Sequence, residues 1–210
     1  MEWKGKLRGF YAVLDRDDPA LARALLSAAR VLQVRLKGAS RQEVERIAGW
    51  ARSLCDERGA LLVVNDDLEA ALAVGADAVH LGQDDLDLAM ARRIVAQRGS
   101  TLRIGISTHD RGQVEAAVLG GADYLGFGPV FATRTKANPD PVQGIVGLAE
   151  AVRAAGAVPV VAIGGVTPES AGAIAEAGAW AACAIAAVND GRDPAGSGSA
   201  IAAAFSRGAR

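Results

Sequence analysis

Polar and apolar side chains alternate from Gln33 to Lys37, where Val34 and Leu36 separate Gln33, Arg35 and Lys37. Because side chains alternate between the two faces of a strand, the three polar residues should share one face. Cations on an inward face need a partner, since an unpaired buried charge is costly. The pattern therefore predicts an anion-binding face, with salt-bridged strand residues as the plainer alternative.

Carboxylates follow two further apolar runs. Asp66 and Asp67 come directly after the run that ends at Asn65, and Asp84 and Asp85 follow the next run. Mg²⁺ prefers one or two carboxylates together with water and substrate phosphate oxygens, so one shared hard cation is the chemistry that these pairs indicate. Aspartate is also a common helix cap, and Asp67 and either Asp84 or Asp85 are candidates for that role.

Ser107 and two histidines lie at other strand ends. Ser107 is either a hydrogen-bond donor to a ligand or a helix cap. His109 is either a proton carrier or a solvated residue at a helix start, and His80 is either chemically active or a satisfied core histidine. The residue types alone do not decide between the two interpretations at any of these three positions.

A polar loop covers residues 131–141 and is longer than most connections between elements. Its length predicts a flap that covers a substrate, with a solvent-exposed insertion as the alternative. Thr133, Thr135 and Lys136 supply hydroxyl groups and a positive charge that suit a phosphate. The loop is therefore a second candidate for anion binding.

The elements that must position these residues repeat one rhythm, a short apolar run followed by an alanine-rich helical pattern. Strands are expected over residues 10–15, 31–37, 61–66, 78–83, 103–108, 124–130, 159–164 and 181–188. The helical period is clearest in Val44, Ile47, Ala48, Ala51 and Leu54. Helix starts are expected at Asp18-Pro19, at Ser40 with Glu43 as a capping box, and at Thr167-Pro168.

Alternating strands and helices indicate a parallel sheet, and eight units predict an α/β protein with one single-domain (β/α)₈ TIM barrel over residues 1–190. An open doubly wound sheet is the structural alternative. Active sites of such barrels lie at the carboxyl ends of the strands, so the polar clusters should converge there. Phosphate is usually bound after strands seven and eight, where Gly164-Gly165 and Ile185-Ala186 offer backbone amides at a helix start. Two anion sites on one face suit two phosphorylated substrates.

Composition excludes several other classes. The 210 residues carry 23 Lys and Arg against 24 Asp and Glu, so the formal net charge is −1 and no basic excess favours nucleic-acid binding. No apolar run approaches the roughly 20 residues of a membrane span, and the first ten residues lack the apolar stretch of a secretory signal. Two cysteines, Cys55 and Cys183, are too few for a disulfide framework, so a reduced, cytoplasmic protein is expected.

Two regions remain open. Residues 191–210 are expected to be a C-terminal tail, loose at residues 196–199 and apolar at residues 201–205, where a last helix can form. Trp50 lies on the helical pattern of residues 44–54, and packing within the chain or contact with a second copy in a homo-oligomer are equally open.

Six motifs in order resemble the thiamine-phosphate synthase family over residues 11–189, nearly the whole chain. They are QVRLK at 33–37, ND at 65–66, VHLGQDD at 79–85, GISTH at 105–109, GPVFATRTK at 128–136 and AIGG at 162–165. Each motif alone is unspecific, whereas six in this order are highly specific.

The resemblance implies a transferase that joins a pyrimidine diphosphate to a thiazole phosphate with Mg²⁺ as cofactor and small phosphorylated molecules as partners. It implies a carbocation route in which Arg35, Lys37 and Lys136 assist the departure of diphosphate. The residues that it places around the pyrimidine diphosphate are Gln33, Arg35, Lys37, Asn65, Ser107 and Lys136. The metal ligands that it implies are Asp66 and Asp85, and the thiazole-phosphate residues are Thr133, Arg134, Thr135, Gly165, Ile185 and Ala186.

This sequence departs from the family pattern in places. Ala186 stands where the family often has Ser, which removes a hydroxyl from the thiazole-phosphate site. Trp180 and the residues 181–184 after it replace a more usual small, polar start and Val-rich strand, and Ala132 replaces a common Pro. These changes predict weaker thiazole-phosphate binding and an altered eighth strand rather than a lost function.

Two rival functions follow from the same residues. A related thiazole tautomerase needs a proton carrier, for which His109 is a candidate, but has no diphosphate to neutralise. The retained Asp66, Asp85, Arg35 and Lys136 therefore favour the synthase. A non-catalytic phosphate-ligand binding protein descended from the synthase is the second rival, and the altered eighth strand is its only support.

Overall fold

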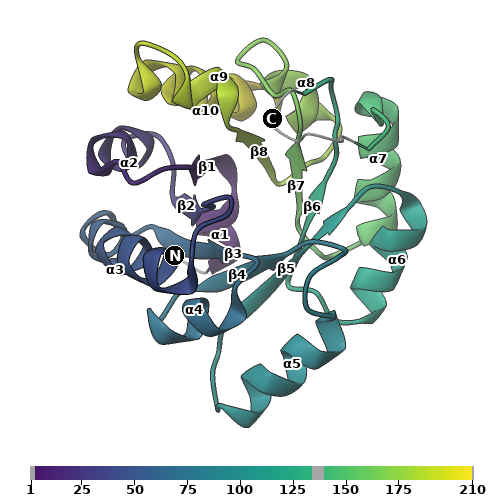
Figure 1. Cartoon of the computed structure of the whole chain (residues 1–210). Helices are drawn as coiled ribbons and strands as arrows, with labels where there is room; N and C mark the ends of the chain where they lie inside the picture. The colour runs from purple at the N-terminus through teal and green to yellow at the C-terminus, as the bar shows by residue number, and fades with distance from the viewer. Residues whose placement is uncertain (1–2, 134–139, 210) are drawn as a thin grey trace.

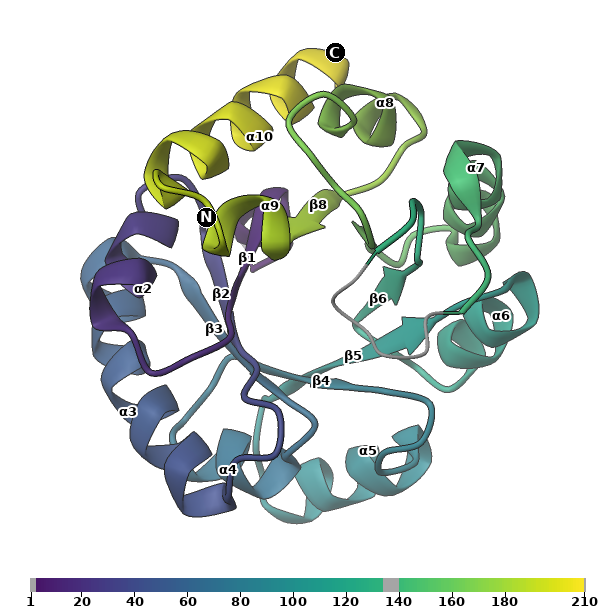
Figure 2. The ribbon, with the colours of Figure 1, turned by 45° about the horizontal axis from the view of Figure 1, so that its top comes forward.

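Eight parallel strands close into a barrel in the order β1 to β8, each strand hydrogen-bonded to the next and β8 to β1. The computed structural model describes residues 3–133 and 140–209. Figure 1 shows the whole chain, and Figure 2 looks into the barrel with the helices outside the strands. The predicted TIM barrel is confirmed. Its strands are β1 (Gly9–Leu14), β2 (Val31–Val34), β3 (Leu61–Asn65), β4 (Ala78–Leu81), β5 (Arg103–Thr108), β6 (Tyr124–Phe127), β7 (Val160–Ile163) and β8 (Ala181–Ala184).

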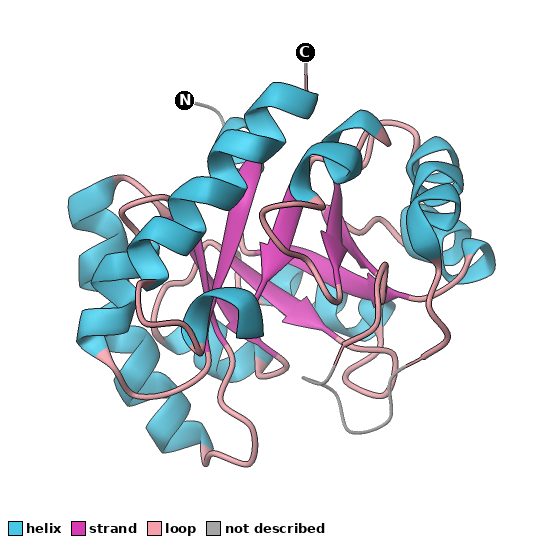
Figure 3. Ribbon diagram, turned by 90° about the horizontal axis from the view of Figure 1, so that it is seen from above, coloured by secondary structure: helices cyan, strands magenta, loops and turns pink. Residues whose placement is uncertain are grey.

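Helices lie around this barrel and at its ends, and Figure 3 distinguishes them from the strands by colour. They are α1 (Trp3–Leu7), α2 (Pro19–Leu25), α3 (Arg41–Arg58), α4 (Leu68–Ala73), α5 (Leu88–Gln97), α6 (Arg111–Leu119), α7 (Gly144–Ala155), α8 (Ala171–Glu176), α9 (Ala186–Asn189) and α10 (Pro194–Gly208). The predicted apolar face of α3, from Val44 to Leu54, is buried against the strands as expected from its 3.6-residue period.

Two of the three expected helix starts are confirmed. Asp18 caps α2 by accepting a hydrogen bond from the Leu21 amide, and Ser40 Oγ accepts from the Glu43 amide at 3.3 Å. The start expected at Thr167 is wrong, because α8 begins four residues later at Ala171. The residues between form a turn in which the Ser170 and Ala171 amides donate to the Thr167 carbonyl.

Four strands are clearly shorter than predicted. The ladder of β2 ends at Val34, and Lys37 lies in a turn beside Gly38, whose φ is +72°. β8 ends at Ala184, because Ile185 leaves the extended region and caps the short helix α9. β4 and β6 also end early, at Leu81 and Phe127. A strand lasts only while its neighbour offers ladder partners, and an apolar or alternating sequence does not encode that limit.

The core has two parts. Outward-facing strand residues pack against the helices in a large outer cluster that includes Leu14, Val34, Val64 and Ile104. Inward-facing residues form a smaller cluster inside the barrel, which contains Leu7, Tyr11, Val13, Val31, Leu61, Val63, Ala78, Tyr124, Val161, Ala181 and Cys183. The barrel is therefore filled by side chains below its open end.

The two ends of the chain complete this arrangement. Helix α1 places Leu7 in the inner cluster and packs the Trp3 ring edge-on to Tyr124, with centroids 6.2 Å apart. The last helix expected after residue 190 forms as α10, which packs against α8 and α2 and buries Ile201 and Phe205. Residues 196–199, expected to be loose, lie within this helix, so that expectation is wrong. Within the described residues, no helix is long and apolar enough to cross a membrane.

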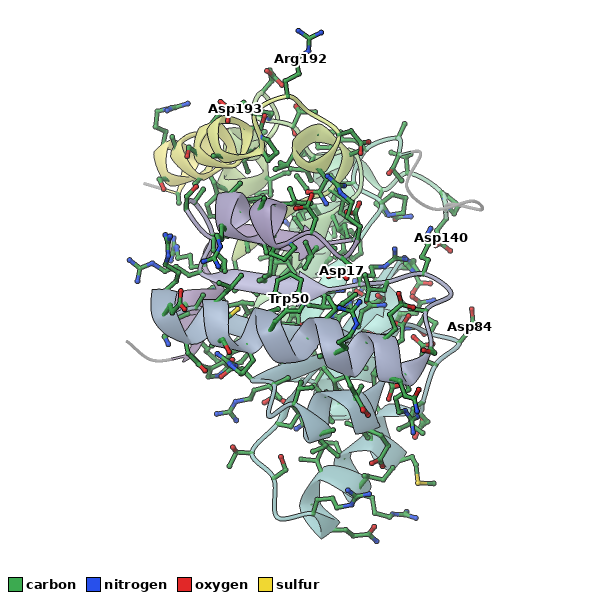
Figure 4. The ribbon with its side chains drawn as sticks, turned by 60° about the vertical axis from the view of Figure 1, so that its left-hand side comes forward. Asp17, Trp50, Asp84, Asp140, Arg192 and Asp193 are labelled. Atoms are coloured by element: carbon green, nitrogen blue, oxygen red, sulfur yellow. The ribbon has the colours of Figure 1, made fainter. Side chains whose placement is uncertain are left out.

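Trp50 packs against the outer core from α3, and its Nε1 donates a hydrogen bond to Asp17 Oδ1 at 3.2 Å. Figure 4 shows Trp50 and Asp17 on the outer face of the molecule, remote from the loops that carry Asp84 and Asp140. Arg46 forms an ion pair with the same Asp17 at 2.7 Å. Trp50 thus has a packing role within the chain.

Candidate active site

Gln33 lies on the inner face of β2, as the alternating pattern predicts. It is buried, with 6% of its surface exposed. Its Nε2 donates to Asn65 Oδ1 at 2.6 Å, and its Oε1 accepts from the Tyr11 hydroxyl at 2.7 Å. The amide group of Asn65 is therefore held at the carboxyl end of β3, next to the acidic cluster.

Arg35 follows β2 and directs its charge into the barrel mouth. Its charge acts on His80, Asp66 and Cys183, which belong to or follow three different strands. Among the residues that the structure describes, its guanidinium has no hydrogen-bonded or ion-paired partner. The salt-bridged alternative is thus wrong for Arg35. Lys37 is exposed in the turn beyond the strand, where the alternation argument no longer applies.

Asp66 and Asp85 face each other at the ends of β3 and β4. Asp85 Oδ2 accepts a hydrogen bond from the Gly82 amide at 2.7 Å, and Asp66 adopts the left-handed conformation with φ +63°. Partial burial, then the hydrogen bond and repulsion from Asp85, raise the pKa of Asp66 to about 7 against the opposing charge of Arg35. Two facing carboxylates, with the ionisation of Asp66 disfavoured beside Asp85, are a donor set that suits a divalent cation.

The neighbouring aspartates have structural roles. Asp67 caps α4 by accepting from the Ala70 amide at 2.9 Å and pairs with Arg41 at 2.8 Å, so its predicted cap role is confirmed. The cap expected from Asp84 or Asp85 is wrong, because Asp87 caps α5 through the amides of Ala89 and Met90. The cap lies later because the loop after β4 continues for six residues before α5 starts.

His80 and Ser107 contact each other inside the barrel. His80 Nε2 lies 3.0 Å from Ser107 Oγ, and His80 Nδ1 lies 3.0 Å from the Tyr124 hydroxyl. Burial, and then the positive charge of Arg35, lower the pKa of His80 to about 4, although Asp85 opposes the shift. The histidine is therefore neutral at physiological pH, as expected of a satisfied core histidine.

His109 follows β5 but is neither free nor solvated, since 21% of its side chain is exposed. Its Nδ1 lies 2.5 Å from the Gly128 carbonyl, and its Nε2 lies 3.4 Å from Asp140 Oδ2. Asp110, not His109 or Ser107, caps α6. The predicted solvated helix-start residue is thus wrong, because His109 links β5 to both sides of the loop after β6.

Gly164 and Gly165 allow close packing of the loop after β6. Both have positive φ, +97° and +63°, and a β-carbon at Gly164 would lie 2.6 Å from the Pro129 Cα atom. A β-carbon at Gly165 would meet Phe131 and Ala132. The expected position at a helix start is wrong for these glycines, because α8 begins only at Ala171.

The helix start on this side of the mouth lies after β8. Ile185 caps α9, so the exposed Ala186 is the first residue of that short helix. A short extra helix after strand eight is the usual phosphate-binding element of this fold. Thr133 and Gly165 are also described and half-buried, whereas the predicted Arg134, Thr135 and Lys136 lie outside the described residues.

Tyr11 and Tyr124 belong to this site but were not predicted from the sequence. Their hydroxyls lie 3.2 Å apart and connect Gln33 on one side with His80 on the other. Both rings are buried, and burial raises the pKa of both hydroxyls above the ordinary tyrosine value. Their inward-facing positions on strands rich in apolar residues made them resemble ordinary core aromatics.

A closed (β/α)₈ barrel with a carboxylate pair, a short helix after β8 and an arginine that has no ion pair among the described residues is an arrangement that suits an enzyme acting on anionic small molecules. Comparison with known proteins specifies the family. The family profile described as thiamine monophosphate synthase matches residues 10–188. The chain therefore belongs to the thiamine monophosphate synthase family, as its motifs predicted.

Individual relatives match over most of their length. The chain is 42% identical over 207 residues to a thiamine-phosphate synthase of Anaeromyxobacter dehalogenans, covering 98% of this chain and 91% of the relative. It is 45% identical over 168 residues to one of Methanospirillum hungatei, covering 79% and 78%. The solved thiamine phosphate pyrophosphorylase from Pyrococcus furiosus superposes with a TM-score of 0.87 at 31% identity, covering 98% of both chains.

Proposed function

We propose that this protein joins 4-amino-2-methyl-5-(diphosphooxymethyl)pyrimidine to thiazole phosphate, giving thiamine phosphate and diphosphate. The observation that carries the proposal is Arg35, which has no ion-paired partner among the described residues, beside the Asp66–Asp85 pair in a chain that the family profile matches over residues 10–188. The bond from the pyrimidine methylene carbon to the diphosphate oxygen breaks, and its electron pair leaves with diphosphate. The thiazole nitrogen then supplies the pair for the new carbon–nitrogen bond.

The pyrimidine diphosphate is assigned to the barrel mouth between β2 and β5. Its contacts are Gln33, Arg35, Lys37, Asn65, Ser107 and Lys136. The buried amide of Gln33, the hydroxyl of Ser107 and the charge of Arg35 support this assignment, since they converge from different strands. Arg35, Lys37 and Lys136 would neutralise the charge that grows on the leaving diphosphate, and a preorganised cation does so without reorganisation.

Mg²⁺ would be held by Asp66 and Asp85. Their mutual repulsion supports this assignment, because a divalent cation relieves it and accepts two carboxylates together with phosphate oxygens. When bound, the cation would add positive charge beside the leaving diphosphate. Asp67 is excluded as a free ligand by its cap and its ion pair with Arg41.

Thiazole phosphate is assigned to Thr133, Arg134, Thr135, Gly165, Ile185 and Ala186. The start of α9 and the close approach of the loop after β6 to Gly165 support this assignment. Binding the phosphate there would aim the thiazole nitrogen at the pyrimidine methylene carbon, which is a positioning effect. No general base is required, because the attacking nitrogen carries no proton.

The contacts of His109 favour the synthase over the tautomerase. A tautomerase needs a residue that carries a proton to and from its substrate, and a general acid or base must reach that substrate. Both ring nitrogens of His109 already face protein oxygens, those of Gly128 and Asp140. His80 is similarly occupied by Tyr124 and Ser107.

The test is an assay of the purified protein with pyrimidine diphosphate, thiazole phosphate and Mg²⁺, scored for thiamine phosphate, with EDTA as the control. Mg²⁺-dependent product is expected. If the folded protein bound both substrates but formed no product, the synthase proposal would be wrong and the non-catalytic ligand-binding function would replace it. Conversion of a thiazole tautomer without metal would favour the isomerase.

A further inference from the structure

Six inward-facing side chains form one continuous hydrogen-bonded chain across the inside of the barrel. This barrel hydrogen-bond chain runs in the order Asn65, Gln33, Tyr11, Tyr124, His80 and Ser107. Its members come from β3, β2, β1, β6, β4 and β5, so it connects strands on opposite sides of the barrel. Its two ends, Asn65 and Ser107, lie at the mouth, whereas its centre is buried beneath them.

Two glycines make room for the rings at the centre. A β-carbon at Gly105 would overlap the Tyr124 ring, and one at Gly126 would lie 2.9 Å from His80 Cε1. Because β5 and β6 lack side chains at these inward positions, the tyrosine and the histidine can approach each other across the barrel. The backbone is therefore shaped around this chain, which argues for a specific role beyond filling the core.

The direction of the hydrogen bonds follows from counting protons. Tyr11 has one hydroxyl proton and donates it to Gln33 Oε1, which can only accept. Its bond with Tyr124 must therefore be donated by Tyr124. Because the Tyr124 hydroxyl proton is already donated to Tyr11, Tyr124 can only accept a hydrogen bond from His80. His80 therefore carries its proton on Nδ1.

The same count fixes both ends of the chain. Because the neutral His80 is protonated on Nδ1, its Nε2 accepts from the Ser107 hydroxyl. Ser107 has then no proton left for a ligand and offers only oxygen lone pairs. At the other end, Gln33 Nε2 donates to Asn65 Oδ1, so Asn65 turns its two N–H donors away from Gln33.

We propose that Tyr11, Tyr124 and His80 are positioning residues that fix the direction of the barrel hydrogen-bond chain, so that Ser107 accepts from a ligand N–H group while Asn65 donates to a ligand acceptor. This inference rests on the proposed function for the identity of the ligand. The exocyclic amino group of the pyrimidine is the N–H donor that Ser107 selects. A pyrimidine with an oxo group at that position would place two acceptors against each other.

The first test measures the histidine tautomer directly and requires no turnover. The chain contains two histidines, so ¹⁵N-histidine labelling and a long-range ¹H–¹⁵N correlation give two ring spectra, and His80→Gln assigns them. At pH 7 the expected result for His80 is a protonated Nδ1 and an unprotonated Nε2. A protonated Nε2 at His80 would reverse every bond in the chain and overturn the proposal.

The second test asks whether the tyrosines set this direction. Tyr124→Phe removes the acceptor of His80 Nδ1–H, so the single tautomer should give way to a mixture. The KM for pyrimidine diphosphate should rise by about 2- to 10-fold, as for one lost hydrogen bond, while the KM for thiazole phosphate stays unchanged. Phe127→Leu on the outward face of β6 is the matched control, since Phe127 is buried in the outer cluster. It should lower thermal stability without changing the tautomer.

The third test concerns the ligand. Binding of the amino pyrimidine diphosphate and of its analogue without the amino group is compared in the wild type and in Ser107→Ala. The wild type should prefer the amino compound by about 10-fold, and Ser107→Ala should lose most of that preference. Equal discrimination by both proteins would contradict the proposal. If the enzyme turned over but His80 were protonated on Nε2, only the inference about the barrel hydrogen-bond chain would be refuted. If His80 were protonated on Nδ1 but no thiamine phosphate formed, only the proposed function would be refuted.

Discussion

At the scale of single residues, the site combines charged groups whose electrostatic energy is unfavourable in the protein alone but becomes favourable when a ligand of opposite charge binds. Arg35 has no hydrogen-bonded or ion-paired partner among the described residues, and Asp66 and Asp85 repel each other. An anion beside Arg35 and a cation between the aspartates would remove both costs together. A metal-bound diphosphate, as in the proposed function, would supply both charges.

Asp66→Asn should raise thermal stability at pH 8 in EDTA and abolish the Mg²⁺ response of turnover. The raised pKa of Asp66, about 7, means that its contribution to stability is complete at low pH and is lost as the pH rises through 7. In EDTA the wild type should therefore melt at a lower temperature at pH 8 than at pH 6, and the variant should lose this difference.

The control for this experiment is Asp84→Asn, which removes the same charge from an exposed neighbour of Asp85. It should keep both the Mg²⁺ response and the pH dependence of melting. Unchanged Mg²⁺ dependence in Asp66→Asn would remove Asp66 from the metal site. Melting temperatures are measured by circular dichroism in EDTA and in Mg²⁺.

At the scale of elements, the short connections at the mouth decide how the site is built. α9 starts immediately after β8, and the loop after β6 packs against the end of β7. The Val130 amide donates to the Ile163 carbonyl and the Phe131 amide to the Gly164 carbonyl, so this loop begins as a continuation of the barrel ladder. The loop's start and α9 are therefore held by backbone contacts.

Ala186→Ser should strengthen thiazole-phosphate binding. The variant adds a hydroxyl at the first residue of α9, where one extra hydrogen bond to a phosphate is worth about 0.5–1.5 kcal/mol. The KM for thiazole phosphate should fall roughly 2- to 10-fold while the KM for pyrimidine diphosphate is unchanged. Ala187→Ser, at the next exposed position of the same helix, is the control and should change neither constant.

Gly165→Ala should impair both stability and turnover. Its φ of +63° disfavours alanine by about 1–3 kcal/mol, and the new methyl group would displace Phe131 and Ala132. Gly59→Ala is the matched control, because Gly59 has φ +60° and open space around it. Denaturant melts should show a loss in both variants, but only Gly165→Ala should lose turnover under conditions where the protein is folded. Full turnover in that variant would separate Gly165 from the thiazole site.

Much of this arrangement could be predicted from the sequence because it depends on local patterns. The strand–helix rhythm identified all eight strands, and alternation placed Gln33 and Arg35 inside. The ends of β2 and β8 could not be predicted, since Lys37 continues the alternation and residues 185–188 continue the apolar run beyond the ladder. The pairing of Tyr11 with Tyr124 depends on barrel closure, which joins residues 113 positions apart.

At the scale of the whole molecule, the barrel separates a stabilising end from a functional end. The bottom is closed by α1, through Leu7 and the edge contact of Trp3 with Tyr124. Arg103 adds a cation–π contact, 5.4 Å from the Trp3 ring centroid. Trp180, directly before β8, donates from Nε1 to the Lys4 carbonyl at 2.8 Å. This contact joins the start of β8 to α1, away from the mouth.

This separation predicts that Leu7→Ala should lower stability without lowering turnover. Leu7 is 1% exposed, and deleting its buried side chain should cost about 2–5 kcal/mol through lost transfer energy and the cavity left behind. The catalytic groups lie at the opposite end of the strands, so kcat and both KM values should stay near wild type at temperatures where the variant is folded. Leu119→Ala, at a position that is 88% exposed, makes the same chemical change and should leave the unfolding free energy unchanged.

If Leu7→Ala changed the KM for pyrimidine diphosphate in fully folded protein, the packing beneath Tyr124 would be coupled to the mouth. The two ends of the barrel would then not be separable, and the barrel hydrogen-bond chain would be the connection to examine.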